Sequence, residues 1–209
     1  MCASRGEGHA TCPRRRFRIG PLLLRDMESD AFLESVESRL RDLTARGVAL
    51  DSRIGSSQWD WSPGPNKWSA GQIFRHMVLA NRPYVDRIPA AVDRVPRSER
   101  NEQPRFTLFG RFLIRAAGPT GNAPAPKALD PGPGPIPRES FAEWQAQNET
   151  LIGLCEAARG KRLDVLALRN QLLPLFRMTL ADCFELIAEH TERHIAQIEA
   201  LSLRPDLPE

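Results

Sequence analysis

The chain has 209 residues, of which 41% are apolar and 26% charged, so it suffices for one well-packed domain and is not disordered throughout. Its apolar runs fall far short of the roughly 20 residues that span a bilayer, which argues against a membrane partner. The net charge is +3, from 29 basic and 26 acidic residues. Residues 1–26 contain six arginines and two acidic residues, so the rest of the chain has 23 basic and 24 acidic residues. The body therefore lacks the positive charge that nucleic-acid partners require.

The first 26 residues differ in composition from the rest. They are rich in Arg and lack helical periodicity, which predicts a basic, disordered tail over residues 1–26. Periodicity begins directly after Met27, which is an alternative translation start. We therefore expect one helical domain over residues 27–204, followed by a short tail over residues 205–209.

Four cysteines are too few for a disulfide scaffold, and no two of them have C-x-x-C spacing. Cys155 and Cys183 lie in apolar helical patterns. This favours small buried side chains that stay reduced in a reducing compartment. Cys2 and Cys12 flank His9, but nothing in such a segment would pre-organise a metal cluster. These cysteines favour a cytoplasmic protein.

The first helix is predicted over residues 29–46, with Gly47 as its end. Its apolar residues recur at spacings of three and four: Phe32, Val36, Leu40 and Leu43. A turn-rich connector follows, in which Trp59 and Trp61 are expected to cap the end of a bundle, although tryptophans also line substrate pockets.

The second helix has a clear start. Ser69 and Gln72 have the spacing of a capping box, and Trp68 and Ile73 have that of a hydrophobic staple. Trp68 could alternatively line a substrate pocket. Pro83 lies inside the helix and is expected to kink or split it.

An apolar segment follows over residues 106–117 and is predicted to form another helix or a lid. Residues 118–137 contain seven Pro and four Gly, which indicates a long irregular connection. The third long helix is predicted to start near residues 138–140, with Ser140 and Glu143 as its capping box.

The fourth helix is predicted over residues 179–202, with Thr179 and Asp182 as its capping box. No useful strand-like alternation is present anywhere. The predicted fold class is therefore all-α, a four-helix bundle with long crossover connections.

Three histidines fall on these helices. His190 and His194 are four residues apart, so both lie on one face, about 40° apart around the axis. His76 lies beside the apolar stripe of the second helix. If the two helices pack together, the three imidazoles would form a three-nitrogen metal site with an open position. The alternative is ordinary half-buried histidines.

The run from Glu189 to His194 is not a zincin motif, since that motif needs a Glu directly after the first His and this position holds Thr191. No general base is apparent. Proximity in sequence makes Glu185, Glu189 and Glu192 candidates, although most helical Glu are solvated. Gln197, one turn beyond His194, either orients a ligand or is solvated.

Two segments resemble the DinB-like superfamily. Residues 61–76 read W-S-P-G-P-N-K-W-S-A-G-Q-I-F-R-H, similar to the family's K-W-S turn, helix start and following His. Residues 190–198 read H-T-E-R-H-I-A-Q-I, similar to its final-helix pattern. A Pro-rich turn after A-P-K-A-L at residues 125–129 resembles a family subgroup. The resemblance covers roughly residues 28–203.

The resemblance implies a DinB-like four-helix bundle with a divalent metal ion, zinc or nickel being favoured, held by His76, His190 and His194. Characterised members include S-transferases that use bacillithiol, mycothiol or glutathione, and a maleylpyruvate isomerase. A low-molecular-weight thiol is thus an implied cofactor, and a small molecule the implied substrate.

Two kinds of function stay open. The leading hypothesis is a metal-dependent enzyme, in which the ion activates either a thiol, as in an S-transferase, or water, as in a hydrolase. The alternative is a non-catalytic helical module that binds a small molecule or dimerises. A homodimer is compatible with either.

Overall fold

The structure is a computed structural model that describes residues 28–99 and 102–209. The predicted basic tail, the alternative start at Met27 and the cysteines around His9 lie outside the described residues. The described part is mostly helical, with four long helices: α1 (Ser29–Asp51), α3 (Ala70–Arg94), α5 (Glu139–Ala157) and α6 (Leu180–Ser202). This confirms the all-α prediction.

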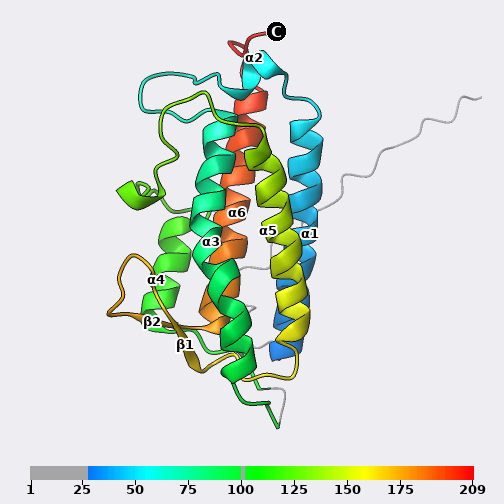
Figure 1. Ribbon diagram of the computed structural model, residues 1–209, viewed down its shortest axis with the longest axis vertical. Helices are drawn as coiled ribbons and strands as arrows, with labels where there is room; N and C mark the ends of the chain where they lie inside the picture. The colour runs from blue at the N-terminus through cyan, green and yellow to red at the C-terminus, as the bar shows by residue number, and fades with distance from the viewer. Residues whose placement is uncertain (1–27, 100–101) are drawn as a thin grey trace, which may run out of the picture.

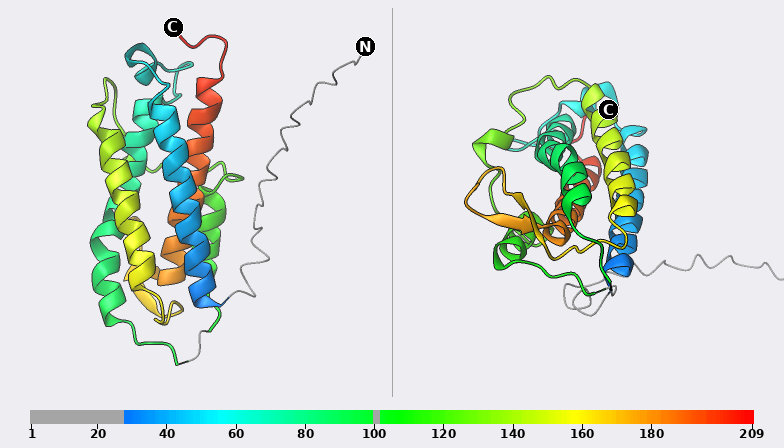
Figure 2. Two further views of the ribbon diagram at one scale, coloured as in Figure 1. Left: turned by 90° about the vertical axis from the view of Figure 1, so that its right-hand side faces the viewer. Right: turned by 60° about the horizontal axis from the view of Figure 1, so that its bottom comes forward.

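The four long helices lie side by side along the longest axis of the molecule (Figures 1 and 2). Both α1 and α3 contact α5 and α6, so the four helices form a closed ring. In Figure 1, α1 and α6 run upward, whereas α3 and α5 run downward. Because α3 and α5 are parallel, their connection must return along the bundle, which explains the long crossover.

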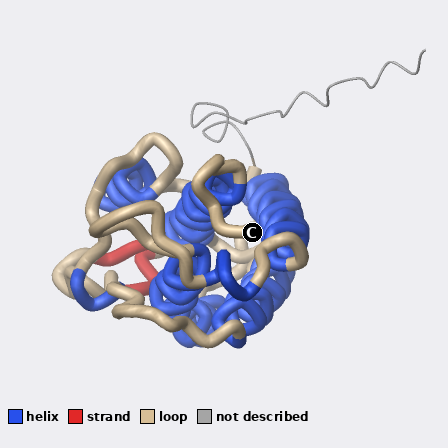
Figure 3. The backbone as a smooth tube through the Cα atoms, turned by 90° about the horizontal axis from the view of Figure 1, so that it is seen from above, coloured by secondary structure: helices blue, strands red, loops and turns tan. Residues whose placement is uncertain are grey.

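The crossover contains two short helices, α4 (Leu108–Ala117) and η2 (Lys127–Leu129). The view from above shows these and the neighbouring loops on one side of the bundle (Figure 3). The apolar segment at residues 106–117 therefore does contain a helix, and α4 packs against α6. Part of the predicted irregular connection forms η2.

Helix α1 continues past Gly47 to Asp51, so the predicted end was wrong. Gly47 is required there by packing. A Cβ at this position would lie 2.5 Å from the ring of Trp144 on α5. The glycine lets two helices approach closely, a reason that no local pattern reveals.

Helix α3 begins as predicted. The Ser69 hydroxyl accepts a hydrogen bond from the Gln72 N–H at 3.2 Å, and Gln72 Oε1 accepts one from the Ser69 N–H at 3.0 Å. Of the two effects expected of Pro83, a kink or a split, the split was wrong: α3 is continuous through Pro83 and Pro89. The helix keeps its buried face on both sides of Pro83, which holds it in the bundle.

The capping box of the fourth helix is confirmed, with Thr179 and Asp182 bonded reciprocally at 3.0 Å. The predicted box at the third helix was wrong. Helix α5 starts at Glu139 after Arg138, without a side-chain cap. Ser140 therefore lies inside the helix and cannot cap it, and Glu143 instead pairs with Arg75 on α3 at 3.5 Å.

The expectation that no strands form was also wrong. Strands β1 (Leu166–Arg169) and β2 (Arg177–Thr179) pair antiparallel between α5 and α6. With four and three residues they are too short to produce a recognisable alternation. A single-turn helix, α2 (Ser56–Trp59), lies between α1 and α3.

The apolar core consists of two clusters along the bundle axis. On α6, residues 180–188 belong to one cluster and residues 195–201 to the other. The polar residues between them break the core at mid-height, and His190 and His194 belong to this break. None of the described helices is both long and apolar enough to cross a membrane.

Candidate metal centre

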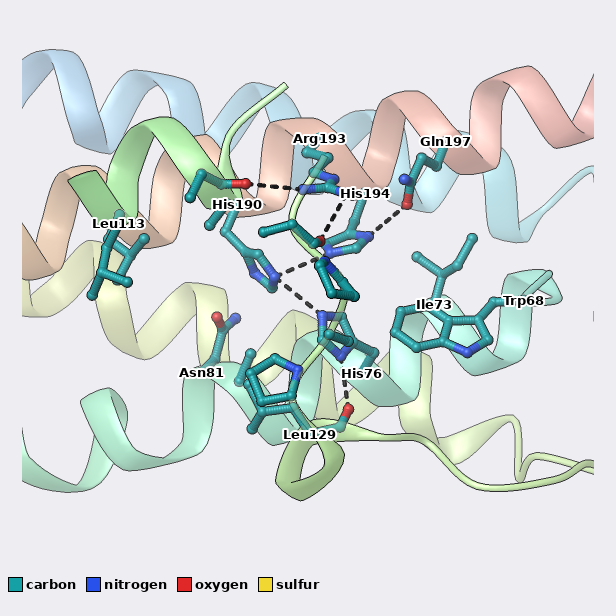
Figure 4. A pocket seen from close by; sticks show the side chains of 18 of the residues that line it. Trp68, Ile73, His76, Asn81, Leu113, Leu129, His190, Arg193, His194 and Gln197 are labelled. Atoms are coloured by element: carbon teal, nitrogen blue, oxygen red, sulfur yellow. Dashed lines mark hydrogen bonds between the residues drawn. The ribbon is translucent and has the colours of Figure 1, made fainter. Parts of the chain in front are cut away.

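The structure brings His76, His190 and His194 together between α3 and α6, where the three imidazoles point toward one another (Figure 4). His190 Nε2 lies 3.2 Å from His76 Nε2 and 3.0 Å from His194 Nε2. One ligand atom of each residue lies within 4.8 Å of the others, so the group could hold a metal ion.

Two of the histidines are each fixed in one tautomer by a hydrogen bond at the second ring nitrogen, Nδ1. His76 Nδ1 lies 2.8 Å from the Leu129 carbonyl oxygen, and His194 Nδ1 lies 2.7 Å from Gln197 Oε1. Both partners can only accept a hydrogen bond, so each Nδ1 carries the proton. The Nε2 atoms of these two residues therefore direct lone pairs toward His190.

His190 Nε2 can donate one proton to only one of these two atoms, so at least one pair of lone pairs meets and repels unless a cation lies between them. Tetrahedral zinc with Zn–N bonds of 2.0–2.1 Å requires nitrogen atoms about 3.3 Å apart. The observed separations of 3.0 and 3.2 Å are close to this value. The hydrogen bonds to Leu129 and Gln197 have the form that orients metal-binding imidazoles in proteins.

Electrostatics keep the three imidazoles neutral. Burial lowers the pKa of His76, His190 and His194, and for His194 the value falls to about 3. The positive charge of Arg193 lowers each pKa further. A neutral imidazole is the form that coordinates a metal ion, so no proton has to be displaced at neutral pH.

The histidines open into a cavity of about 610 Å³ between α3, α6 and the crossover. Its walls near the histidines are apolar, formed by residues such as Trp68, Ile73, Leu113, Leu129 and Ile187. The Trp68 ring packs against His76, with centroids 4.7 Å apart. The cavity leaves room beside the imidazoles for a fourth ligand and a bound small molecule.

The charge in the cavity wall has one sign. Lys67 and Arg193 line it, and no acidic side chain does so among the described residues. The Arg193 guanidinium donates hydrogen bonds to the carbonyl oxygens of Ala116 at 3.2 Å and Ala123 at 3.5 Å, and forms no ion pair within the described part. Its positive charge is thus held beside the cavity by neutral partners.

The three glutamates considered as general bases do not line the cavity. Glu185 and Glu189 pair with Arg39 of α1 at 2.9 and 2.6 Å. Glu192 pairs with Arg46 of α1 at 3.0 Å. Arginines on α1 thus hold these carboxylates on the side of α6 that faces α1.

The tryptophans divide into two roles. Trp59 is buried, stacks on Phe74 and donates its indole N–H to the Ile136 carbonyl oxygen at 2.7 Å, as a packing residue does. Trp61 packs against the same apolar cluster. Trp68 also packs against this cluster and in addition lines the cavity.

The two described cysteines are buried and free, as expected. Burial raises the pKa of the Cys155 thiol to about 12 and places that of Cys183 well above its usual value. Neither is a nucleophile at neutral pH.

Sequence reasoning missed three groups at this site: the Leu129 carbonyl, Arg193 and Asn81. Arg193 is part of the H-x-x-R-H pattern and was visible there. Asn81 is a polar residue on the apolar side of its helix, which is a usable signal. Nothing local indicates the Leu129 carbonyl, because the path of the crossover decides its position.

A family model described as the DinB superfamily matches residues 34–198. The match covers most of the chain and includes all three histidines, so the chain belongs to the DinB superfamily. No curated protein and no solved structure matches the chain.

Proposed function

We propose that the protein is a metal-dependent transferase that activates a low-molecular-weight thiol, with zinc or nickel held by His76, His190 and His194. One observation carries the proposal. Three converging Nε2 atoms, two of them on imidazoles oriented by a hydrogen bond, face a cavity of about 610 Å³ whose described walls include cations but no carboxylate.

A divalent ion in this group would lower the pKa of a thiol bound beside it. The chain itself supplies orientation and environment. Leu129 and Gln197 fix the imidazoles, and the apolar wall around Trp68 excludes water. The cations Lys67 and Arg193 favour a negatively charged thiolate over the neutral thiol.

The alternative of a hydrolase is less well supported. A base that activates water must lie within about 3.2 Å of it or act through a second water. The carboxylates of α6 that might serve are paired with arginines of α1, as shown for Glu185 and Glu192. A metal ion lowers the pKa of bound water too, so the thiol reaction is favoured only because no carboxylate of the described residues lines this cavity to relay a proton from water to the leaving group.

The first test is elemental analysis of untagged protein, beside His190→Ala and a matched His9→Ala control. We expect about one equivalent of zinc or nickel in the wild type and the control, and its loss in His190→Ala. Absence of metal, even after reconstitution, would leave the non-catalytic helical module as the better account.

The second test offers bacillithiol, mycothiol and glutathione, each with a soluble electrophile, and measures thioether formation. We expect catalysis with one thiol by the wild type and none by His190→Ala. Metal content without thioether formation, together with ester or amide hydrolysis, would instead establish the hydrolase. The homodimer and the cytoplasmic location stay predictions that gel filtration and fractionation can check.

A further inference from the structure

Asn81 of α3 has an unpartnered donor at the cavity. Its side chain is 1% exposed, and its Nδ2 has no hydrogen-bond partner. The residue lines the cavity and projects from α3 on the side where His76 and His190 lie (Figure 4). An unpaired buried N–H group costs on the order of 1–3 kcal/mol, so its retention calls for an explanation.

Four further described residues have one unpartnered buried atom: Trp144, Gln147, Asn148 and Thr191. None of these lines the cavity, whereas Asn81 does. Asn81 differs because the residue lines the cavity, so a rotation of its buried amide about χ2 can turn the donor toward a molecule bound there.

The charges beside the cavity indicate what kind of acceptor such a molecule carries. Arg193 and Lys67 are the charged residues of the described wall, and Arg193 is neutralised by no carboxylate. An anionic oxygen would therefore be attracted by both cations and repelled by no acidic side chain. The remaining wall, including Ile73 and Leu113, favours an apolar body on the same molecule.

We propose that Asn81 is a specificity-determining residue that donates a hydrogen bond from Nδ2 to the carboxylate of a small substrate with an apolar body, with Arg193 supplying the attracting charge. This proposal names the class of substrate for the proposed function. The reaction of that substrate rests on the proposed function, whereas its binding through Asn81 does not.

The probe is benzoate, with benzamide as a neutral molecule of the same shape. Both are titrated calorimetrically into zinc-reconstituted protein and into protein treated with a chelator. We expect benzoate to bind at least 10-fold more tightly than benzamide, in both forms. A carboxylate that merely ligates the metal would lose its affinity after chelation, which would overturn the proposal.

The variant Asn81→Leu keeps the side-chain volume and removes the donor. We expect it to lose about 10-fold in benzoate affinity while its melting temperature rises, because the unpaired donor is gone. The matched control is Asn148→Leu, which removes an equally buried amide outside the cavity and should bind benzoate as the wild type does. A structural role for Asn81 would lower the melting temperature and leave the affinity unchanged.

Asn81→Asp provides a second variant should Asn81→Leu not fold. Its carboxylate would repel benzoate and reverse the preference toward benzamide. Unchanged benzoate affinity in the folded Asn81 variants, or no benzoate binding by the wild type at millimolar concentration, would overturn the proposal. Metal content is measured on the same samples, so failure of the metal-dependent function would show separately.

Discussion

Two of the three histidines at mid-height of the bundle are held by a hydrogen-bond partner at the second ring nitrogen. His76 depends on the Leu129 carbonyl, and His194 on Gln197. His190 is placed between them by the helical spacing of α6. The chemistry of this group therefore depends on burial and on hydrogen bonds as much as on the residue type.

Acid should destabilise the metal-free protein. The pKa of His194 is about 3 in the fold, and an unfolded histidine has a pKa near 6.5. Below pH ~6.5 the unfolded chain binds more protons than the folded one, so stability falls as the pH decreases toward ~3. Urea unfolding of chelated protein should show a loss of about 2 kcal/mol for this histidine between pH 7 and pH 5. His194→Gln should reduce that slope, and an equal slope in both proteins would contradict the prediction.

The partner of the second nitrogen should matter for metal affinity. Gln197→Leu removes the acceptor that fixes His194, so we expect metal affinity to fall roughly 10- to 100-fold in competition with a chromophoric chelator. Gln145→Leu on α5 is the control, because its amide contacts only Glu149 at 3.4 Å. Equal affinities for the two variants would show that Gln197 does not orient the ligand.

Among the elements, α4 connects the crossover to the bundle through one carboxylate. Asp182, near the start of α6, accepts hydrogen bonds from the Thr107 N–H at 3.0 Å and the Thr107 hydroxyl at 2.8 Å. The Thr107 hydroxyl in turn accepts the Gly110 N–H at 2.8 Å and caps α4. Because α4 forms part of the cavity wall, these hydrogen bonds between Thr107 and Asp182 also shape the site.

A side chain at Gly110 should disrupt the contact between α4 and Asp182. A Cβ there would overlap the Asp182 carboxylate, so Gly110→Ala should destabilise the protein by about 1–3 kcal/mol in urea unfolding. Gly153→Ala in α5 is the matched control. No atom lies within 4 Å of a Cβ at that site, and the helix should gain about 1 kcal/mol. A stabilised Gly110→Ala protein would refute the close approach.

Across the whole molecule, α1 and α6 are joined by a ladder of ion pairs on the face away from the cavity. Arg39 contacts Glu185 and Glu189, and Arg46 contacts Glu192 and Glu199. Burial raises the pKa of Glu185 even though Arg39 opposes this effect. The ladder fixes the rotation of α6 and thereby directs its histidines toward α3.

Removal of one cation from this ladder should be costly. Arg39→Met leaves the buried Glu185 carboxylate unpaired, so we expect a loss of about 3–5 kcal/mol in thermal or urea unfolding at pH 7. Arg41→Met on the same helix breaks an exposed pair with Glu37 and should cost less than about 1 kcal/mol. Similar losses in both variants would show that burial does not control the strength of the pair.

Local patterns predicted the elements and part of the site. Apolar spacing located the long helices, the capping boxes at Ser69 and Thr179 gave two starts, and the interval of four residues placed His190 and His194 on one face. These features depend on contacts within one helical turn, which the sequence specifies directly. The short strands were missed because three or four residues carry too little periodicity.

The sequence by itself thus determined which segments are helical, where two of them begin, and that three histidines are available to one site. Only the tertiary structure decided that α1 passes through Gly47, that the α6 glutamates pair with α1, and that the Leu129 carbonyl and Asn81 reach the cavity. These outcomes depend on the rotation of each helix and the path of the crossover. Contacts between residues far apart in the chain set both, and no local pattern encodes them.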